Sequence, residues 1–147
     1  MTPELIALIV VGTLVVLVSA LLIFRRMPKK LKSDIYITRW REIQNYCKDK
    51  KQWPQALVEA DALLDTALKR RKFKGKSMGE RMVSAQRLFT NNDGVWFAHN
   101  LYKKVVAEPS TRLKEADMKA ALVGFRQALK DLGALQTADE IAKKGES

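Results

Sequence analysis

Few residues of this sequence could do chemistry. The chain has one histidine, His99, and one cysteine, Cys47. With a single imidazole no Ser–His–Asp arrangement can be proposed, and a zinc site would need carboxylates or another chain to complete it. Cys47 falls in an apolar stripe, so we expect it to pack as a small hydrophobic residue. For His99 we expect a packing or surface role rather than a catalytic one.

No catalytic, cofactor-binding or metal-ligating residue is predicted. The seven glycines are scattered, and none forms the GxxxxGK or GxGxxG pattern of a phosphate-binding loop. Three carboxylates, Glu59, Asp61 and Asp65, lie close together in the sequence. Paired carboxylates can do acid–base work. On a helix with basic neighbours, however, we expect them to form a solvated face.

A run of cations at residues 69–76 is the more informative charge feature. Six of its eight positions are Lys or Arg, and Phe73 interrupts them. Such a run could contact phosphates, either of RNA or of lipid, although the dipole of a preceding helix also favours cations at its end. The candidate residues for contact with a phosphate or a partner are Lys69, Arg70, Arg71, Lys72, Lys74, Lys76, Lys103 and Lys104.

An uncharged stretch of twenty residues, from Leu5 to Phe24, predicts a transmembrane anchor over residues 1–25. As an α-helix it would extend about 30 Å, which is the thickness of the hydrocarbon core of a bilayer. The preceding MTPE has no Lys or Arg, and the small residues around Ser19 run directly into more apolar sequence. Both features argue against a cleaved signal peptide, so we expect the helix to be retained.

The charges that flank this stretch predict its orientation. Glu4 is the only charged side chain before residue 25, so the remainder of the chain carries +12, which is the net +11 less the −1 of Glu4. The positive-inside rule then places the N-terminus outside the plasma membrane and residues 25–147 in the cytoplasm. Five cations directly follow the stretch and either contact anionic lipid or only determine the topology: Arg25, Arg26, Lys29, Lys30 and Lys32.

Helical periodicity continues beyond the anchor. Pro28 predicts a short basic hinge over residues 26–33, and helices are then expected from Ser33 to Lys50, from Pro54 towards residue 69, from Met78 through Leu88, over residues 95–105, and from Lys114 to Leu132. No stretch alternates as a strand does. We therefore predict an all-α protein in which residues 34–135 form an up-and-down bundle of four to five helices, followed by a polar tail at 136–147.

Four segments of this bundle resemble a group of short bacterial single-pass membrane proteins, common in candidate-phyla bacteria, whose anchor precedes an HEPN-like helical domain. They are WPQALVEADALLDTALK (residues 53–69), GKSMGERM (75–82), WFAHNLYKKVVAEP (96–109) and ADMKAALVGFRQALKDLGAL (116–135). The resemblance covers about 80 residues and implies the HEPN-like fold. It also implies a homodimer, because such domains often pair through their helices.

The same resemblance implies that ribonuclease activity is lost. In similar members the region reads A-H-x-L-R-N-x-x-x-H-E-P, and HEPN ribonucleases use its Arg and its second His. Here Tyr102 stands in place of the Arg, Lys103 in place of the Asn and Ala107 in place of the His. Neither a phosphate clamp nor an acid–base pair remains at these positions.

These features favour a non-enzymatic, membrane-tethered interaction or scaffold module on the cytoplasmic face, with an unidentified protein partner. The alternative is a membrane-anchored protein that binds nucleic acid, RNA in particular, through its basic run. A ribonuclease ranks third, since it would need unfamiliar catalytic residues. No cofactor is predicted.

Overall fold

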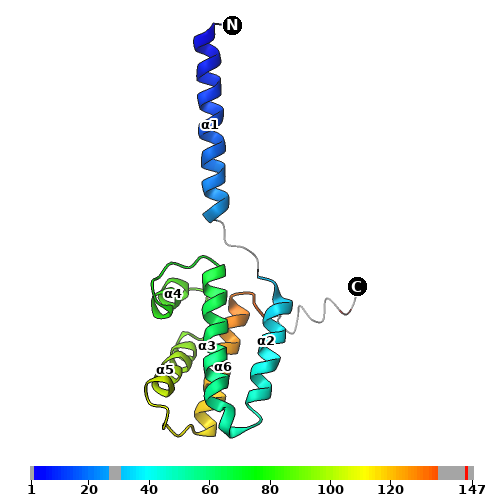
Figure 1. Cartoon of the computed structure of the whole chain (residues 1–147), viewed down its shortest axis with the longest axis vertical. Coiled ribbons are helices and arrows are strands. Elements are labelled where there is room, and N and C mark those ends of the chain that lie inside the picture. The colour runs from blue at the N-terminus through cyan, green and yellow to red at the C-terminus, as the bar shows by residue number, and fades with distance from the viewer. Residues whose placement is uncertain (1, 27–30, 136–144, 146–147) are drawn as a thin grey trace.

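Helices form every element over residues 2–26 and 31–135, which with residue 145 are the residues that this computed structural model describes. In chain order the elements are α1 (Pro3–Arg26), α2 (Ser33–Tyr46), the 3₁₀ turn η1 (Lys50–Gln52), α3 (Trp53–Arg70), α4 (Met78–Ala85), α5 (Asn92–Ala107) and α6 (Glu115–Asp131). The predicted all-α class is confirmed: an N-terminal apolar helix precedes a helical bundle (Figure 1).

α1 has 24 residues, which extend about 36 Å at 1.5 Å per residue. None of its span Pro3–Arg25 is buried within the protein. Its one threonine, Thr13, donates its hydroxyl to the carbonyl oxygen of Ile9 at 2.8 Å and is therefore satisfied inside the helix. This helix is long enough and apolar enough to cross a membrane.

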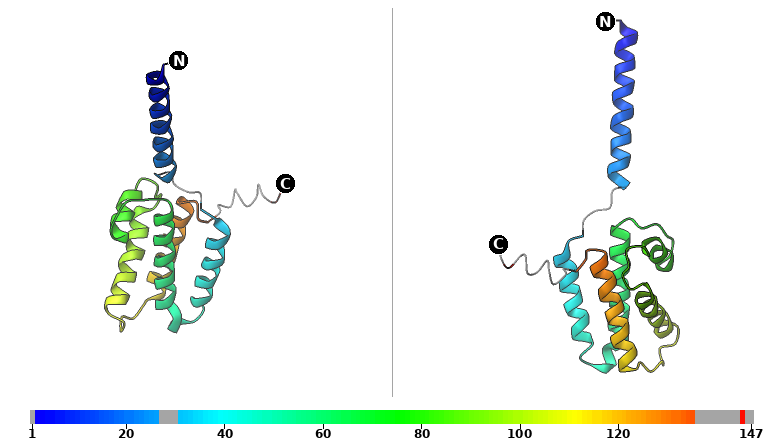
Figure 2. Two further views of the ribbon diagram at one scale, coloured as in Figure 1. Left: turned by 45° about the horizontal axis from the view of Figure 1, so that its top comes forward. Right: turned by 180° about the vertical axis from the view of Figure 1, so that it is seen from behind.

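Two antiparallel hairpins make up the bundle, α2 with α3 and α5 with α6, and the short α4 connects them (Figures 1 and 2). α3 lies at the centre and packs against α2, α4, α5 and α6. α3 turns an apolar stripe towards the core, in which Leu57, Leu64 and Leu68 are completely buried. Pro54 lies in the first turn of α3, where its missing N–H costs no hydrogen bond.

Two predicted helix ends are wrong. α2 ends at Tyr46 rather than at Lys50, because the chain turns and the indole of Trp53 donates to the carbonyl oxygen of Cys47 at 2.8 Å. α4 ends at Ala85 rather than running through Leu88, which is exposed. The turn after α4 instead carries Phe89 into the core. In both places a side chain that lies beyond the apolar stripe decides where the helix stops.

α5 and α6 meet at a glycine. A Cβ atom added at Gly124 would lie 2.7 Å from the carbonyl carbon of Gly94 and 3.3 Å from the amide nitrogen of Val95. Only a glycine therefore lets α6 approach the first turn of α5 this closely. α6 ends before Gly133, whose φ of +81° lies in the left-handed region that commonly ends a helix.

The bundle begins earlier than the predicted boundary at residue 34. Leu31 is buried in the core, and Lys32 is the N-cap residue of α2. Of the predicted hinge, Arg26 belongs to the last turn of α1, whereas Lys29 and Lys30 lie outside the described residues. The predicted tail at 136–147 also lies outside them, apart from residue 145.

One end of the bundle lies close to α1 along the chain. Leu31 follows Arg26 by five residues, so the chain between them spans at most about 18 Å. Because the helices alternate in direction, the start of α2 and the ends of α3 and α6 all lie at this end (Figures 1 and 2). We call it the anchor-proximal end. The connections at residues 47–52 and 108–114 lie at the opposite, distal end.

Candidate phosphate-contacting interface

The predicted run of cations, residues 69–76, connects α3 to α4 at the anchor-proximal end, and we call it the basic loop (Figure 1). Lys69 and Arg70 form the last turn of α3, and Arg71 is its C-cap residue. Lys72 has a φ of 63°, so the backbone reverses there in the left-handed region. The chain therefore reverses direction immediately after α3 ends.

Hydrogen bonds hold the backbone of the basic loop in place. The amide of Phe73 donates to the carbonyl oxygen of Leu68 at 3.1 Å, and the hydroxyl of Ser84 donates to the carbonyl oxygen of Lys74 at 2.6 Å. A capping box forms in part at the start of α4. Ser77 accepts from the amide of Glu80 at 3.2 Å. The Glu80 carboxylate accepts from the amide of Lys76, at 2.6 Å, rather than from that of Ser77.

Arg81, on α4, connects the basic loop to α3 by hydrogen bonds. Its side chain is buried, and its Nε donates to Asp65 at 2.7 Å while its Nη1 donates to the carbonyl oxygen of Gly75 at 2.9 Å. Burial opposes ionisation of the Asp65 carboxyl, but hydrogen bonds from Arg81 and Lys69 outweigh it and lower the pKa of Asp65. Asp65 is therefore charged at neutral pH, and the ion pair fixes the conformation of the loop.

Arg71 differs from its neighbours in the basic loop because it bonds inward. Its Nη1 donates to the carbonyl oxygen of Leu132 at 2.6 Å, and its guanidinium lies over the ring of Phe73, 5.9 Å from the centroid. The bond to Leu132 joins the ends of α3 and α6. Arg71 is thus half-buried and holds the bundle together rather than facing a partner.

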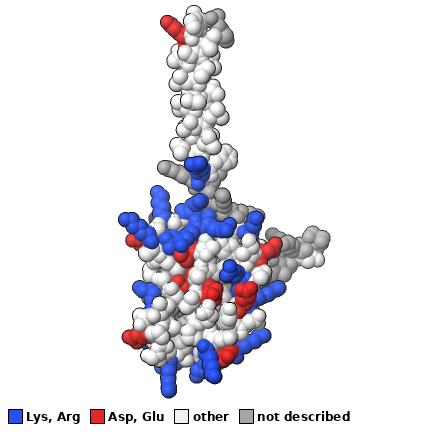
Figure 3. Space-filling view, viewed as in Figure 1, with Lys and Arg blue, Asp and Glu red and all other residues white. Residues whose placement is uncertain are grey.

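The remaining cations of the loop point outward. Lys72, Lys74 and Lys76 are exposed and make no ion pair among the described residues, whereas Lys69 pairs with Asp65 at 3.0 Å. Lys and Arg side chains gather in a band across the anchor-proximal end (Figure 3). Of the five cations predicted to flank the anchor, Arg25 and Lys32 are exposed, and the side chains of the other three are not described.

Lys103 and Lys104 are not brought to this band. Both are exposed on the second half of α5, which leads to the connection at residues 108–114 and so lies towards the distal end (Figure 1). The prediction placed these lysines with the basic loop because of their charge alone. The structure separates the two sets by most of the length of the bundle.

The positions that correspond to the HEPN motif also lie on this half of α5. Tyr102 is half-buried, and its ring stacks on that of His99 with centroids 6.0 Å apart. Lys103 points into solvent, and Ala107 is the exposed last residue of the helix. These three side chains supply neither a guanidinium nor an imidazole at the positions where the resemblance implies them.

A buried pair, Asp61 with His99, corrects the expectation that the carboxylates of α3 form a solvated face. Asp61 is 5% exposed and His99 7%, and the Nδ1 of His99 lies 2.7 Å from an oxygen of Asp61. Burial raises the pKa of Asp61 above its ordinary value, against the hydrogen bond with His99, which lowers it. The signal was present in the sequence, since Asp61 lies four residues after Leu57 and three before Leu64, within the buried stripe.

This pair joins α3 to α5 within the core. The ring of Trp96 lies 6.1 Å from that of His99 in a T-shaped arrangement, and the ring of Tyr102 stacks on it at 6.0 Å. Across the parts of the chain that the structure describes, no three His, Cys, Asp or Glu residues gather as metal ligands would. The pair thus links two core helices through one buried hydrogen bond.

Comparison of the chain with protein families, with curated proteins and with solved structures found no match. The HEPN-like resemblance therefore stays a prediction.

Proposed function

We propose that the chain is a membrane-tethered, non-enzymatic interaction module on the cytoplasmic face, with α1 in the bilayer and the anchor-proximal end of the bundle against anionic headgroups. One observation carries this proposal: the unpaired cations of the basic loop lie at the end of the bundle that the short chain from α1 enters. A cation close to an anionic leaflet contributes about 1 kcal/mol to the attraction.

Tethering leaves the distal end and the sides of the bundle free for a partner. Among the described residues, Phe97 and Val106 on α5 are large apolar side chains that remain exposed. A protein partner, or a second copy of the chain, would meet the bundle on a face that does not contact the membrane.

RNA binding is the weaker alternative. Binding of single-stranded RNA commonly combines cations with an aromatic ring on which a base stacks. Phe73, the one aromatic residue of the basic loop, packs instead against the core beneath Arg71. Lys103 and Lys104 lie too far towards the distal end to extend the same surface. These positions favour contact with a flat charged surface over contact with an RNA strand.

The test compares two positions of one fluorophore in the full chain. Cys47 is replaced by Ser, and either Lys74→Cys or Arg112→Cys provides the only thiol for labelling in liposomes that contain phosphatidylglycerol. Lys74 belongs to the basic loop and Arg112 to the distal connection, and both side chains are exposed. A quencher carried on lipid headgroups should quench the fluorophore at position 74 and leave that at position 112 bright. Equal quenching at both positions would refute the proposed orientation.

A further inference from the structure

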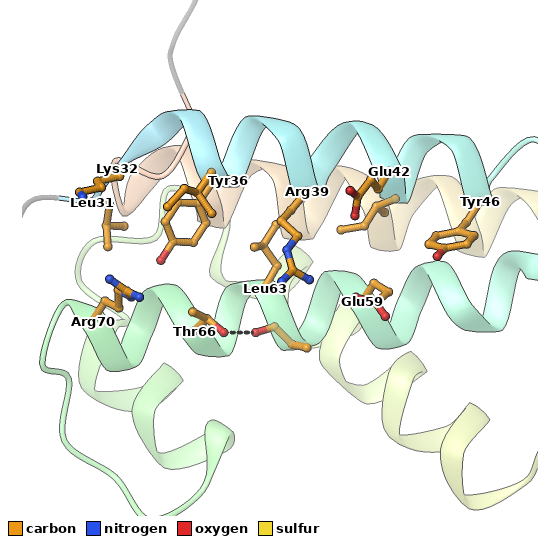
Figure 4. A pocket seen from close by; sticks show the side chains of 13 residues that line it. Leu31, Lys32, Tyr36, Arg39, Glu42, Tyr46, Glu59, Leu63, Thr66 and Arg70 are labelled. Atoms are coloured by element: carbon orange, nitrogen blue, oxygen red, sulfur yellow. Dashed lines mark hydrogen bonds between the residues drawn. The ribbon is translucent and has the colours of Figure 1, made fainter.

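A groove of about 460 Å³ runs between α2 and α3 (Figure 4). Its volume is within the range of sites that bind small molecules, which is about 300–1,000 Å³. Leu31, Ile43 and Leu63 form an apolar floor. Leu31 and Lys32, where the chain arrives from α1, line one end of the groove, which therefore lies at the anchor-proximal end of the bundle.

The charges along the groove are sorted by sign. Lys32 on α2 and Arg70 on α3 lie at the anchor-proximal end, Arg39 follows midway, and Glu42 and Glu59 lie further along (Figure 4). The three cations are exposed and make no ion pair with any other residue that the structure describes. An anion that enters from the membrane side would therefore meet only positive charge first.

The phenol of Tyr36 is the second observation that indicates a ligand. Tyr36 is 3% exposed and lines the groove, and its hydroxyl is buried without a hydrogen-bond partner among the described residues. Burial raises the pKa of this phenol, against the lowering influence of Arg70, so the hydroxyl keeps its proton and can donate. A buried hydroxyl is normally hydrogen-bonded, and an anionic oxygen beside Arg70 would accept this one.

We propose that the α2–α3 groove binds one anionic phospholipid of the adjoining bilayer. The phosphate lies between Lys32 and Arg70 and accepts from Tyr36, and the glycerol region rests on the apolar floor. The charge of the three cations and their continuity with the basic loop argue for this occupant. The inference rests on the proposed function, which brings the open end of the groove to the membrane.

The test titrates the full chain, held in a neutral detergent, with short-chain lipids and counts bound molecules by native mass spectrometry. One dioctanoyl phosphatidylglycerol should bind at least about tenfold more tightly than dioctanoyl phosphatidylcholine, because the charge-assisted hydrogen bonds favour the lipid with net negative charge. Equal binding of the two lipids would overturn the inference. Glycerol 3-phosphate serves as the soluble phosphate, and if it binds as tightly as the lipid, the occupant is not a lipid.

Matched variants locate the site. Arg70→Gln and Tyr36→Phe should each weaken phosphatidylglycerol binding by about fivefold or more, since each removes a donor to the phosphate. Lys103→Gln removes the same charge from an exposed lysine on the second half of α5, outside the groove and the basic loop, and it should leave binding unchanged. Equal losses for Arg70→Gln and Lys103→Gln would mean that diffuse charge holds the lipid. That result would refute lipid binding in the groove while leaving the proposed function intact. Circular dichroism checks that each variant is folded.

Discussion

At the scale of single residues, Gly124 sets how closely α5 and α6 pack. An added Cβ would collide with the backbone of Gly94, so Gly124→Ala should lower the free energy of unfolding by about 2 kcal/mol. Urea unfolding followed by tryptophan fluorescence measures this change in the bundle alone, because all three tryptophans, at positions 40, 53 and 96, lie beyond α1.

Gly79→Ala is the matched control for this substitution. A Cβ at Gly79 would make ordinary contact with the ring of Trp96, at 3.7 Å. Because alanine favours a helix over glycine, this variant should gain about 0.5–1 kcal/mol. Equal stability of Gly124→Ala and Gly79→Ala would contradict the conclusion that α5 and α6 approach closely at Gly124.

Asp65 should make the free energy of unfolding depend on pH, with lower stability at acidic pH. Hydrogen bonds from Arg81 and Lys69 hold its pKa below the ordinary value, so the folded state favours the carboxylate. The stabilisation is present above the unfolded pKa of about 3.9 and is lost as the pH falls through the folded pKa. The difference in unfolding free energy between the wild type and Asp65→Asn should therefore shrink as the pH is lowered below about 4.

Asp61→Asn tests the opposite sign. Burial raises the pKa of Asp61, so its contribution is present below the unfolded pKa and is lost as the pH rises through the folded pKa. Because a protonated carboxyl resembles the amide of Asn, the wild type and this variant should be similar in stability at low pH, and the wild type should lose stability relative to the variant as the pH rises. Parallel pH profiles for the two variants would contradict the different environments of these carboxylates.

At the scale of elements, the basic loop combines one structural cation with several that serve the surface. Arg71→Gln removes the bond to Leu132 between the ends of α3 and α6, and should cost about 1–2 kcal/mol of unfolding free energy. Lys72→Gln, the next residue along the chain, removes an exposed and unpaired charge and should change stability by less than about 0.5 kcal/mol. The same urea titration measures both, and equal losses would contradict the inward position of Arg71.

The elements themselves were largely predictable from the sequence. The stripe of α3 and the bounds of α6 follow from apolar residues at helical spacing, which needs no knowledge of the tertiary structure. The ends of α2 and α4 were not predictable, because a Trp53–Cys47 hydrogen bond and the burial of Phe89 decide them. The role of Arg71 was missed because a contact across the fold, to Leu132, decides it. The position of Asp61 within the apolar stripe of α3 already indicated its burial, but its pairing with His99 depends on how α3 and α5 pack.

At the scale of the whole molecule, the topology is the first prediction to check. In a Cys47→Ser background, Thr2→Cys should react with a membrane-impermeant maleimide on intact cells, because the positive-inside rule places the N-terminus outside. Lys74→Cys should react only after lysis. If Lys74→Cys were labelled on intact cells, the predicted orientation would be wrong and the bundle would lie outside the cytoplasm.

The basic loop lies on the side of the bundle next to α1 because the chain runs along the bundle twice before it. α2 leads away from α1 and α3 returns, so any charge at the end of α3 lies on the side of α1 (Figure 1). The sequence supplied both the alternation of helices and the cations. What it could not supply is the outward position of Lys72 and its neighbours, which depends on hydrogen bonds from α4.

The length of α3 separates the two ends of the bundle by more than the range of electrostatic interactions in salt solution. Its 18 residues extend about 27 Å, whereas salt at physiological concentration screens charges over about 8 Å. If the basic loop touches the headgroups, the connection at residues 108–114 stands about three screening lengths away from them. The field of the bilayer then reaches one end of the protein and not the other. A change in the lipid charge would act on how the bundle is held, while a partner at the distal end would experience the ionic conditions of bulk solution.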